Sequence, residues 1–209
     1  MATVRVADGR TRHGRDHGEH AGRPTGREPA RRDDVARRYA TALVGSRRYT
    51  RLYIVDAAAG LPSAEATSKR LLKNQEDIGN AIEPYYGSAA GAKLTDLLKQ
   101  HILIAVDLVA AAKANDQTKL ADADKRWHAN AADIASFLSS ANPNWPKQTL
   151  LSMLNEHLAL TTQEATARLQ QRWDDDIAAF DKIFSQAMMM ADALSNGIAK
   201  QFPGKVNTN

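Results

Sequence analysis

The chain contains no cysteine, and glycine and proline are scarce, with 12 and 7 residues among 209. The lack of cysteine excludes disulfides, cysteine-ligated zinc, iron–sulfur clusters and thiol catalysis. The scarcity of glycine and proline leaves few helix-breaking positions, while Ala and Leu, both strong helix formers, are abundant. We therefore predict an all-α fold, and hydrophobic residues at 43% of the chain are enough for one substantial core.

Two further absences concern charge and membranes. No apolar run approaches the roughly 18 unbroken residues that a transmembrane helix needs, so none is predicted. The formal net charge is +4, but residues 1–50 hold 12 Arg, no Lys and 6 acidic residues. The rest of the chain then carries 16 basic and 18 acidic residues, a net charge of −2. Because the basic excess belongs to the N-terminal segment, the body of the protein is not predicted to bind nucleic acid.

Residues 1–32 are rich in Arg, Gly and His and show almost no apolar periodicity, which predicts a disordered tail. The tail lacks the apolar core of a signal peptide, so the protein as written is predicted to be cytoplasmic. The first lysine is Lys69, although the body uses lysine freely, which suggests that a misassigned start supplied much of residues 1–46. A different native N-terminus would make the protein an exported one. His13, His17 and His20 are spaced for metal chelation.

From Asp33 onward the apolar residues recur with the helical period, and no segment alternates as a strand does. Gly60 is expected just after the end of the first helix, and Pro84 is expected to end the second. We predict an up-and-down bundle of five to six amphipathic helices over residues 33–202, followed by a loose end at 203–209. The expected helices cover about 33–60, 63–83, 91–114, 117–140, 146–170 and 174–202.

Known catalytic motifs are absent from the body. The chain has no G-x-G-x-x-G or G-x4-G-K-[ST] loop for a nucleotide, no G-x-S-x-G elbow and no H-E-x-x-H helix. The di-iron bundle motif Glu-x-x-His also fails, because Leu98, Lys125 and Leu154 stand three residues before the three body histidines. Standard nucleotide, hydrolase and di-iron chemistry is therefore not expected.

Four polar residues fall on the apolar stripes of four different helices, and buried polar groups must find hydrogen-bond partners. We therefore expect them to meet one another or a ligand inside the bundle. The four are Asn74, His101, Asn130 and His157. Acidic and hydroxyl side chains about one turn away extend this set. These are Asp77, Asp107, Asp133, Thr161 and Glu164, and Arg51 is a further candidate as an anion clamp near the bundle end.

Six stretches of the body form a distinctive set: "YTRLYIVDAAAGLP", "NQEDIGNAIEPYYG", "HILIAVDLVAAAKAND", "ANPNWP", "HLALTTQEATARL" and "MADALSNGIAKQFP". Through them, residues from about 49 to 202 resemble a family of uncharacterised bacterial all-helical proteins, some of which carry a glycosyltransferase label. The resemblance implies a helical fold and brings no biochemical role with it. In that family the matching segment looks like His-x-x-Trp-Thr-Arg, whereas here Ser46 takes the histidine place and Tyr49 the tryptophan place. A third histidine is therefore missing. The body shows no Rossmann-like alternation and no Asp-x-Asp at a strand end, so a nucleotide-sugar site is not expected.

Three functional hypotheses follow from these residues. The first is a bundle that binds a small ligand or a metal ion between its helices, with His101, His157, Asn74, Asp77, Asn130, Glu164 and Arg51 as candidates. The second is a metal- or haem-dependent enzyme in which His101 and His157 are the metal ligands, a transition metal or haem being the implied cofactor. The third is a structural or interaction bundle with an inert polar core. The oligomeric state stays open.

Overall fold

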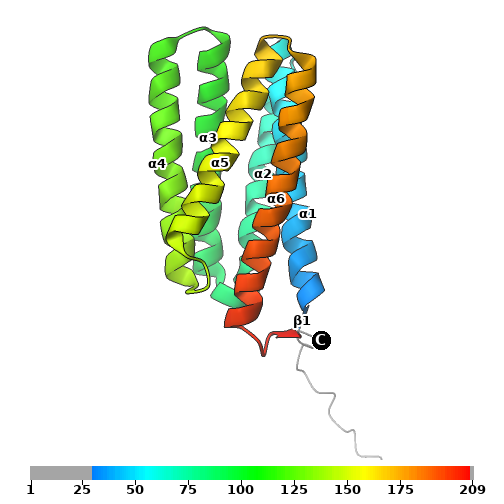
Figure 1. The fold of residues 1–209 in the computed structure, drawn as a ribbon, viewed down its shortest axis with the longest axis vertical. Helices are drawn as coiled ribbons and strands as arrows, with labels where there is room; N and C mark the ends of the chain where they lie inside the picture. The colour runs from blue at the N-terminus through cyan, green and yellow to red at the C-terminus, as the bar shows by residue number, and fades with distance from the viewer. Residues whose placement is uncertain (1–29, 208–209) are drawn as a thin grey trace, which may run out of the picture.

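Six long helices account for most of residues 30–207, the part of the chain that the computed structural model describes (Figure 1). Their bounds are α1 Arg32–Ala59, α2 Ala64–Tyr86, α3 Ser88–Lys113, α4 Gln117–Ala141, α5 Lys147–Leu169 and α6 Trp173–Gln201. This confirms the all-α fold and the division of the last helical segment near residue 170. Residues 1–29 lie outside the described part, and with them most of the predicted tail and the three tail histidines.

The helices form a closed ring in which each one packs against the next in sequence and α6 packs against α1 (Figure 1). The short connections make neighbours antiparallel, so α1, α3 and α5 share one direction. These three helices also contact one another across the ring. Residues at the same height on α1, α3 and α5 therefore meet at the centre of the bundle.

The turns show why the helices end where they do. Gly60 has a φ of +69° and donates its N–H to the Ala57 carbonyl, which confirms its place as the C′ residue of α1. Pro84, by contrast, lies inside the last turn of α2, so the predicted end at residue 83 was wrong. The helix runs to Tyr86, three residues beyond the predicted end, and is followed by Gly87, whose N–H bonds to the Glu83 carbonyl. Helix α3 starts directly afterwards at Ser88, three residues earlier than predicted.

The C-terminal segment is also more ordered than the sequence indicated. Residues 203–209 were predicted to be loose, but β2, Val206–Asn207, pairs in parallel with β1, Ala30–Arg31. Val206 has no exposed surface and belongs to the main core. This short pair joins the two ends of the described chain beneath α1 and α6 (Figure 1).

The core runs the length of the ring and contains large apolar side chains from every helix. At one end Trp145, from the Asn142–Pro146 turn, is 3% exposed and packs on Gly197 of α6. The turn is held by Asn142, whose side-chain oxygen accepts the Asn144 backbone N–H. No helix of the described residues has the length and apolar character to cross a membrane.

Helices α2 and α3 approach each other most closely where Gly79 faces Gly91. A Cβ added at Gly79 would lie 2.6 Å from the Gly91 carbonyl oxygen, and one added at Gly91 would lie 2.9 Å from the Gly79 carbonyl oxygen. Backbone atoms cannot rotate away as a side chain can, so an alanine at either position must push the helices apart. The two glycines therefore set the α2–α3 distance.

We predict that Gly79→Ala lowers the free energy of unfolding by about 2 kcal/mol, because overpacking against a fixed backbone is destabilising. Urea denaturation followed by circular dichroism measures this change. Gly204→Ala is the matched control, since a Cβ there meets nothing within 4 Å and its unfolding curve should stay at the wild-type position. Equal effects of the two substitutions would contradict the close-approach explanation.

Candidate functional site

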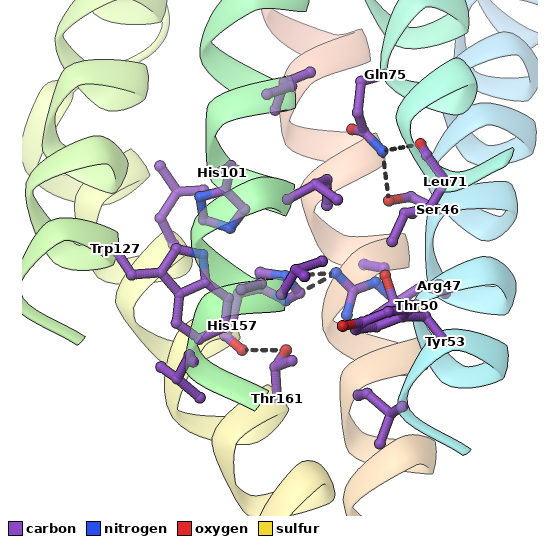
Figure 2. A pocket seen from close by; sticks show the side chains of 18 of the residues that line it. Ser46, Arg47, Thr50, Tyr53, Leu71, Gln75, His101, Trp127, His157 and Thr161 are labelled. Carbon is purple, nitrogen blue, oxygen red and sulfur yellow. Dashed lines mark hydrogen bonds between the residues drawn. The ribbon is translucent and has the colours of Figure 1, made fainter. Parts of the chain in front are cut away.

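A cavity of about 90 Å³ lies at the centre of the ring, where α1, α3 and α5 meet (Figure 2). Its wall is mostly apolar, with a small group of polar side chains facing inward from different helices. The polar side chains on this wall include Arg47, Gln75, His101, Trp127, His157 and Thr161. Figure 2 shows the guanidinium of Arg47 pointing from α1 toward His157 on α5, with His101 and Trp127 on the far side.

His101 is held on α3 by Asn130 of α4. The Asn130 amide nitrogen donates to the Leu97 carbonyl at 3.1 Å, so its oxygen faces His101 Nδ1 at 2.7 Å and accepts from it. This assigns the His101 proton to Nδ1 and leaves a lone pair on Nε2. The ring also packs on Trp127, with the centroids 5.2 Å apart. Burial, opposed by the Asn130 bond and assisted by the nearby Arg47 charge, lowers the pKa of His101 to about 4, so the imidazole is neutral near pH 7.

His157 lies beside His101, with the ring centroids 6.1 Å apart and the planes 24° from parallel. Its partner is Arg47, whose Nη2 lies 2.7 Å from Nε2 and 2.9 Å from Nδ1 of the ring. A neutral imidazole has one acceptor nitrogen, so only one of these contacts is a hydrogen bond. Burial, the Arg47 charge and His101 all lower the pKa of His157 well below 6.5. His157 therefore accepts a hydrogen bond from Arg47 but supplies no negative charge.

Arg47 is the unusual residue of the site, because it is 8% exposed and has no carboxylate partner among the described residues. Burial lowers its pKa to about 10, and the field of Glu164 opposes this only in part. The side chain still carries its charge at pH 7. Among the described residues, the Arg47 Nε–H also has no hydrogen-bond partner, and neither does the Trp127 Nε1–H at the other side of the cavity. A buried cation and two unpaired donors thus line one cavity.

Arg51, one turn further along α1, is in a different situation. It bonds Glu164 of α5 at 3.0 Å and forms a two-point contact with Asp176 of α6, through Nη2 at 2.8 Å and through Nη1. Arg168 also lies 3.5 Å from Asp176. Burial raises the pKa of Glu164, and the Arg51 contacts oppose that shift. Two arginines and two carboxylates therefore balance each other, and this cluster joins α1, α5 and α6.

The structure brings together only part of the predicted site. His101 and His157 line the cavity and Asn130 supports one of them, as a shared polar site requires. Asn74 is buried but bonds the Ala42 carbonyl at 2.9 Å between α1 and α2, outside the cavity wall. Asp77 is 45% exposed and faces Arg70 at 3.8 Å on the surface. Their placement in the site was therefore wrong, because both lie on the α1 side of α2 and not on its inward stripe.

Glu164 and Arg51 also need correction as ligand-binding residues. Each is already paired with opposite charge, and neither contributes to the cavity wall. Of the two neighbouring arginines, Arg47 lines the cavity and Arg51 does not. The sequence carried a signal for this, since Leu43, Arg47, Thr50 and Ile54 follow the i, i+4, i+7, i+11 pattern of an inward stripe.

The charges at the site bear on the metal hypothesis for His101 and His157. No group of three or more His, Cys, Asp or Glu side chains able to hold a metal ion occurs in the described part of the chain. A cation between the two imidazoles would also meet the Arg47 guanidinium, which already contacts both nitrogens of His157. A haem is far larger than a 90 Å³ cavity. The local charge thus favours an anion over a cation.

Comparison of the chain with family models, with curated proteins and with solved structures gave no match.

We predict that acid destabilises the bundle through its buried histidines. The folded pKa of His101 is lowered to about 4, so between the unfolded value of 6.5 and pH 4 only the unfolded chain takes up the proton. The contribution of the neutral histidines to the free energy of unfolding is complete above about pH 6.5. It falls as the pH drops, and the loss at pH 5 is about 2 kcal/mol for His101 alone.

The measurement is the free energy of unfolding from pH 8 to pH 4 for wild type, His101→Gln and His128→Gln. His101→Gln should remove the part due to His101, about 2 kcal/mol at pH 5, and leave the part due to His157. His128 is 47% exposed, so His128→Gln is the matched control and should leave the slope unchanged. An unchanged slope in His101→Gln would contradict the assignment of this buried neutral imidazole.

We further predict that Arg51→Met lowers the free energy of unfolding by about 3 kcal/mol, because it leaves Glu164 and Asp176 buried without their main partner. Arg126→Met removes an arginine of the same kind from an exposed ion pair and should cost less than about 1 kcal/mol. Chemical denaturation at pH 7 compares the two variants. Similar costs would mean that the α1–α5–α6 cluster is no more important than a surface pair.

Proposed function

We propose that this protein is a binding protein for a small anionic ligand, which is held in the central cavity with Arg47 as its charge partner. The observation that carries the proposal is the burial of the Arg47 guanidinium against a neutral imidazole, with no carboxylate paired to it among the described residues. A buried charge is costly unless an opposite charge compensates it. A bound anion supplies that compensation, and the protein's own side chains supply none at this position.

The donors around the cavity support an acceptor-rich ligand. The Nε–H groups of Arg47 and Trp127 are buried and unpaired. A carboxylate only accepts hydrogen bonds, and its two oxygens match the forked donors of a guanidinium. The imidazoles stay neutral near pH 7 and so add no competing positive charge.

The size of the cavity limits the ligand. An apolar cavity of about 150 Å³ holds benzene, which has six non-hydrogen atoms, so a space of about 90 Å³ corresponds to a few non-hydrogen atoms. A planar carboxylate group fits this limit, whereas a nucleotide, a sugar or a haem exceeds it. We assign binding and not turnover, because nothing in the cavity forms a nucleophile–base pair among the described residues.

The test compares acetate with acetamide, which has nearly the same shape but no charge. We expect acetate to bind wild-type protein and raise its thermal midpoint, while acetamide at the same concentration has no effect. Direct contact is followed by NMR titration of the ring C–H signals of His101 and His157. These signals should shift on addition of acetate, whereas the His128 signal on the exposed face of α4 should not.

The variants Arg47→Met and Arg126→Met separate the buried charge from arginine content in general. Arg47→Met should lose the acetate response, and Arg126→Met should keep it, since Arg126 is exposed on α4 and does not line the cavity. If Arg47→Met fails to fold, Arg47→Lys is measured in its place. This variant keeps the positive charge and should therefore keep the acetate response. No response to either compound would favour an inert polar core. An equal response to acetate and acetamide would mean that the charge plays no part in binding. Either outcome would overturn the proposal.

A further inference from the structure

A second cavity of about 70 Å³ lies next to the first, between it and Trp145 at the end of the bundle. Its wall is almost entirely apolar side chains. The two cavities share six wall residues, one from each helix: Leu43, Ile78, Leu98, Ile134, Leu154 and Met190. We call these six residues the apolar collar. Every helix contributes one side chain to the collar. Since these six side chains line both cavities, the collar is the layer that separates the two cavities in the described bundle.

The collar stands one helical turn from the charged end of the site. On the three parallel helices, Leu43 precedes Arg47 by four residues, Leu98 precedes His101 by three, and Leu154 precedes His157 by three. Residues three or four apart on a helix lie on the same face. The polar residues thus form one level, the collar forms the next level toward Trp145, and the second cavity follows below it.

This order of levels defines an amphiphilic space with a charged end and an apolar end. An anion whose carboxylate contacts Arg47 has its remaining atoms facing the collar, where only apolar contacts are offered. We propose that the ligand is an unbranched aliphatic monocarboxylate whose chain passes the collar into the second cavity. This inference rests on the proposed function, since it assigns the rest of a molecule whose carboxylate group is the anion bound by Arg47.

The cavity volumes set the length of the chain. A cavity of about 150 Å³ lined by apolar residues holds benzene, which has six non-hydrogen atoms. The two cavities, of about 90 and 70 Å³, are together of that size. A carboxylate with a chain of four to six carbons in all has about six to eight non-hydrogen atoms and matches this space. Acids of ten carbons exceed it.

The collar explains why the site would select a flexible chain over a ring. Its members are branched or flexible aliphatic side chains without polar atoms, apart from the polarisable thioether of Met190. A single methylene chain needs only small rotamer changes in such a layer, whereas an aromatic ring needs the collar to open on several helices at once.

The experiment is a calorimetric titration of the full chain with sodium acetate, butanoate, pentanoate, hexanoate and decanoate. We expect the Kd to fall about fourfold for each added methylene up to pentanoate or hexanoate, from the transfer of each group out of water. Decanoate should bind more weakly than hexanoate, because its chain exceeds the two cavities.

The matched variants are Ala193→Leu and Ala121→Leu. Ala193 lines only the second cavity, and a leucine there adds three carbon atoms to a space of about 70 Å³. The readout is the ratio of the Kd values for acetate and pentanoate, which Ala193→Leu should reduce to near one. Ala121 is exposed on α4, so Ala121→Leu should keep the wild-type ratio.

The outcomes separate this inference from the proposed function. Acetate binding that depends on Arg47, with no gain from longer chains, would overturn the inference and leave the proposed function standing. No binding of any carboxylate would overturn both. Binding of 1-pentanol as tight as that of pentanoate, and unchanged in Arg47→Met, would show an apolar site without a charged end and would also overturn the inference.

Discussion

The contact between Arg47 and His157 is the interaction on which the centre of this bundle depends. It places a full positive charge where water is excluded and gives it a partner without charge. Such an arrangement holds only if the imidazole stays neutral, because a protonated His157 would repel the guanidinium. The burial that keeps His157 neutral is the same burial that makes the charge of Arg47 costly.

The neighbouring cluster shows the contrast within a single helix. Arg51 lies four residues after Arg47, yet its charge is matched by Glu164 and Asp176, and these contacts join three helices. A balanced cluster of this kind has no electrostatic need for a ligand. Arg47, by contrast, has no carboxylate partner among the described residues and lies beside a cavity, which is why the proposed anion is placed there.

The ring topology turns these local contacts into a layered interior. Because α1, α3 and α5 run in the same direction and touch across the ring, one helical turn separates a polar level from an apolar level on all three at once. A bundle without the central contacts would scatter the same residues over separate helix pairs. The close approach of α2 and α3 at Gly79 and Gly91 helps to keep the ring narrow enough for those contacts.

The periodicity of the sequence by itself determined the six helices, most of their ends and the polar character of the core. These features depend on local rules: apolar spacing of 3.6 residues, a C′ glycine such as Gly60, and the break near residue 170. The end of α2 was not predicted by those rules, because Pro84 is tolerated in the last turn of this helix. The pairing of Val206–Asn207 with Ala30–Arg31 also escaped them, because it joins opposite ends of the chain.

For the site, the sequence correctly placed His101, Asn130 and His157 on inward stripes. It also carried the stripe signal for Arg47, but it could not show which arginine has carboxylate partners. Which charge is matched depends on the rotation of each helix and on which helices adjoin it, and neither is encoded in a single helix's pattern. Only the tertiary structure placed Asp176 beside Arg51 and a neutral imidazole beside Arg47. It also moved Asn74 and Asp77 out of the site, because the position of a polar residue around a helix has meaning only relative to the neighbour that the helix faces.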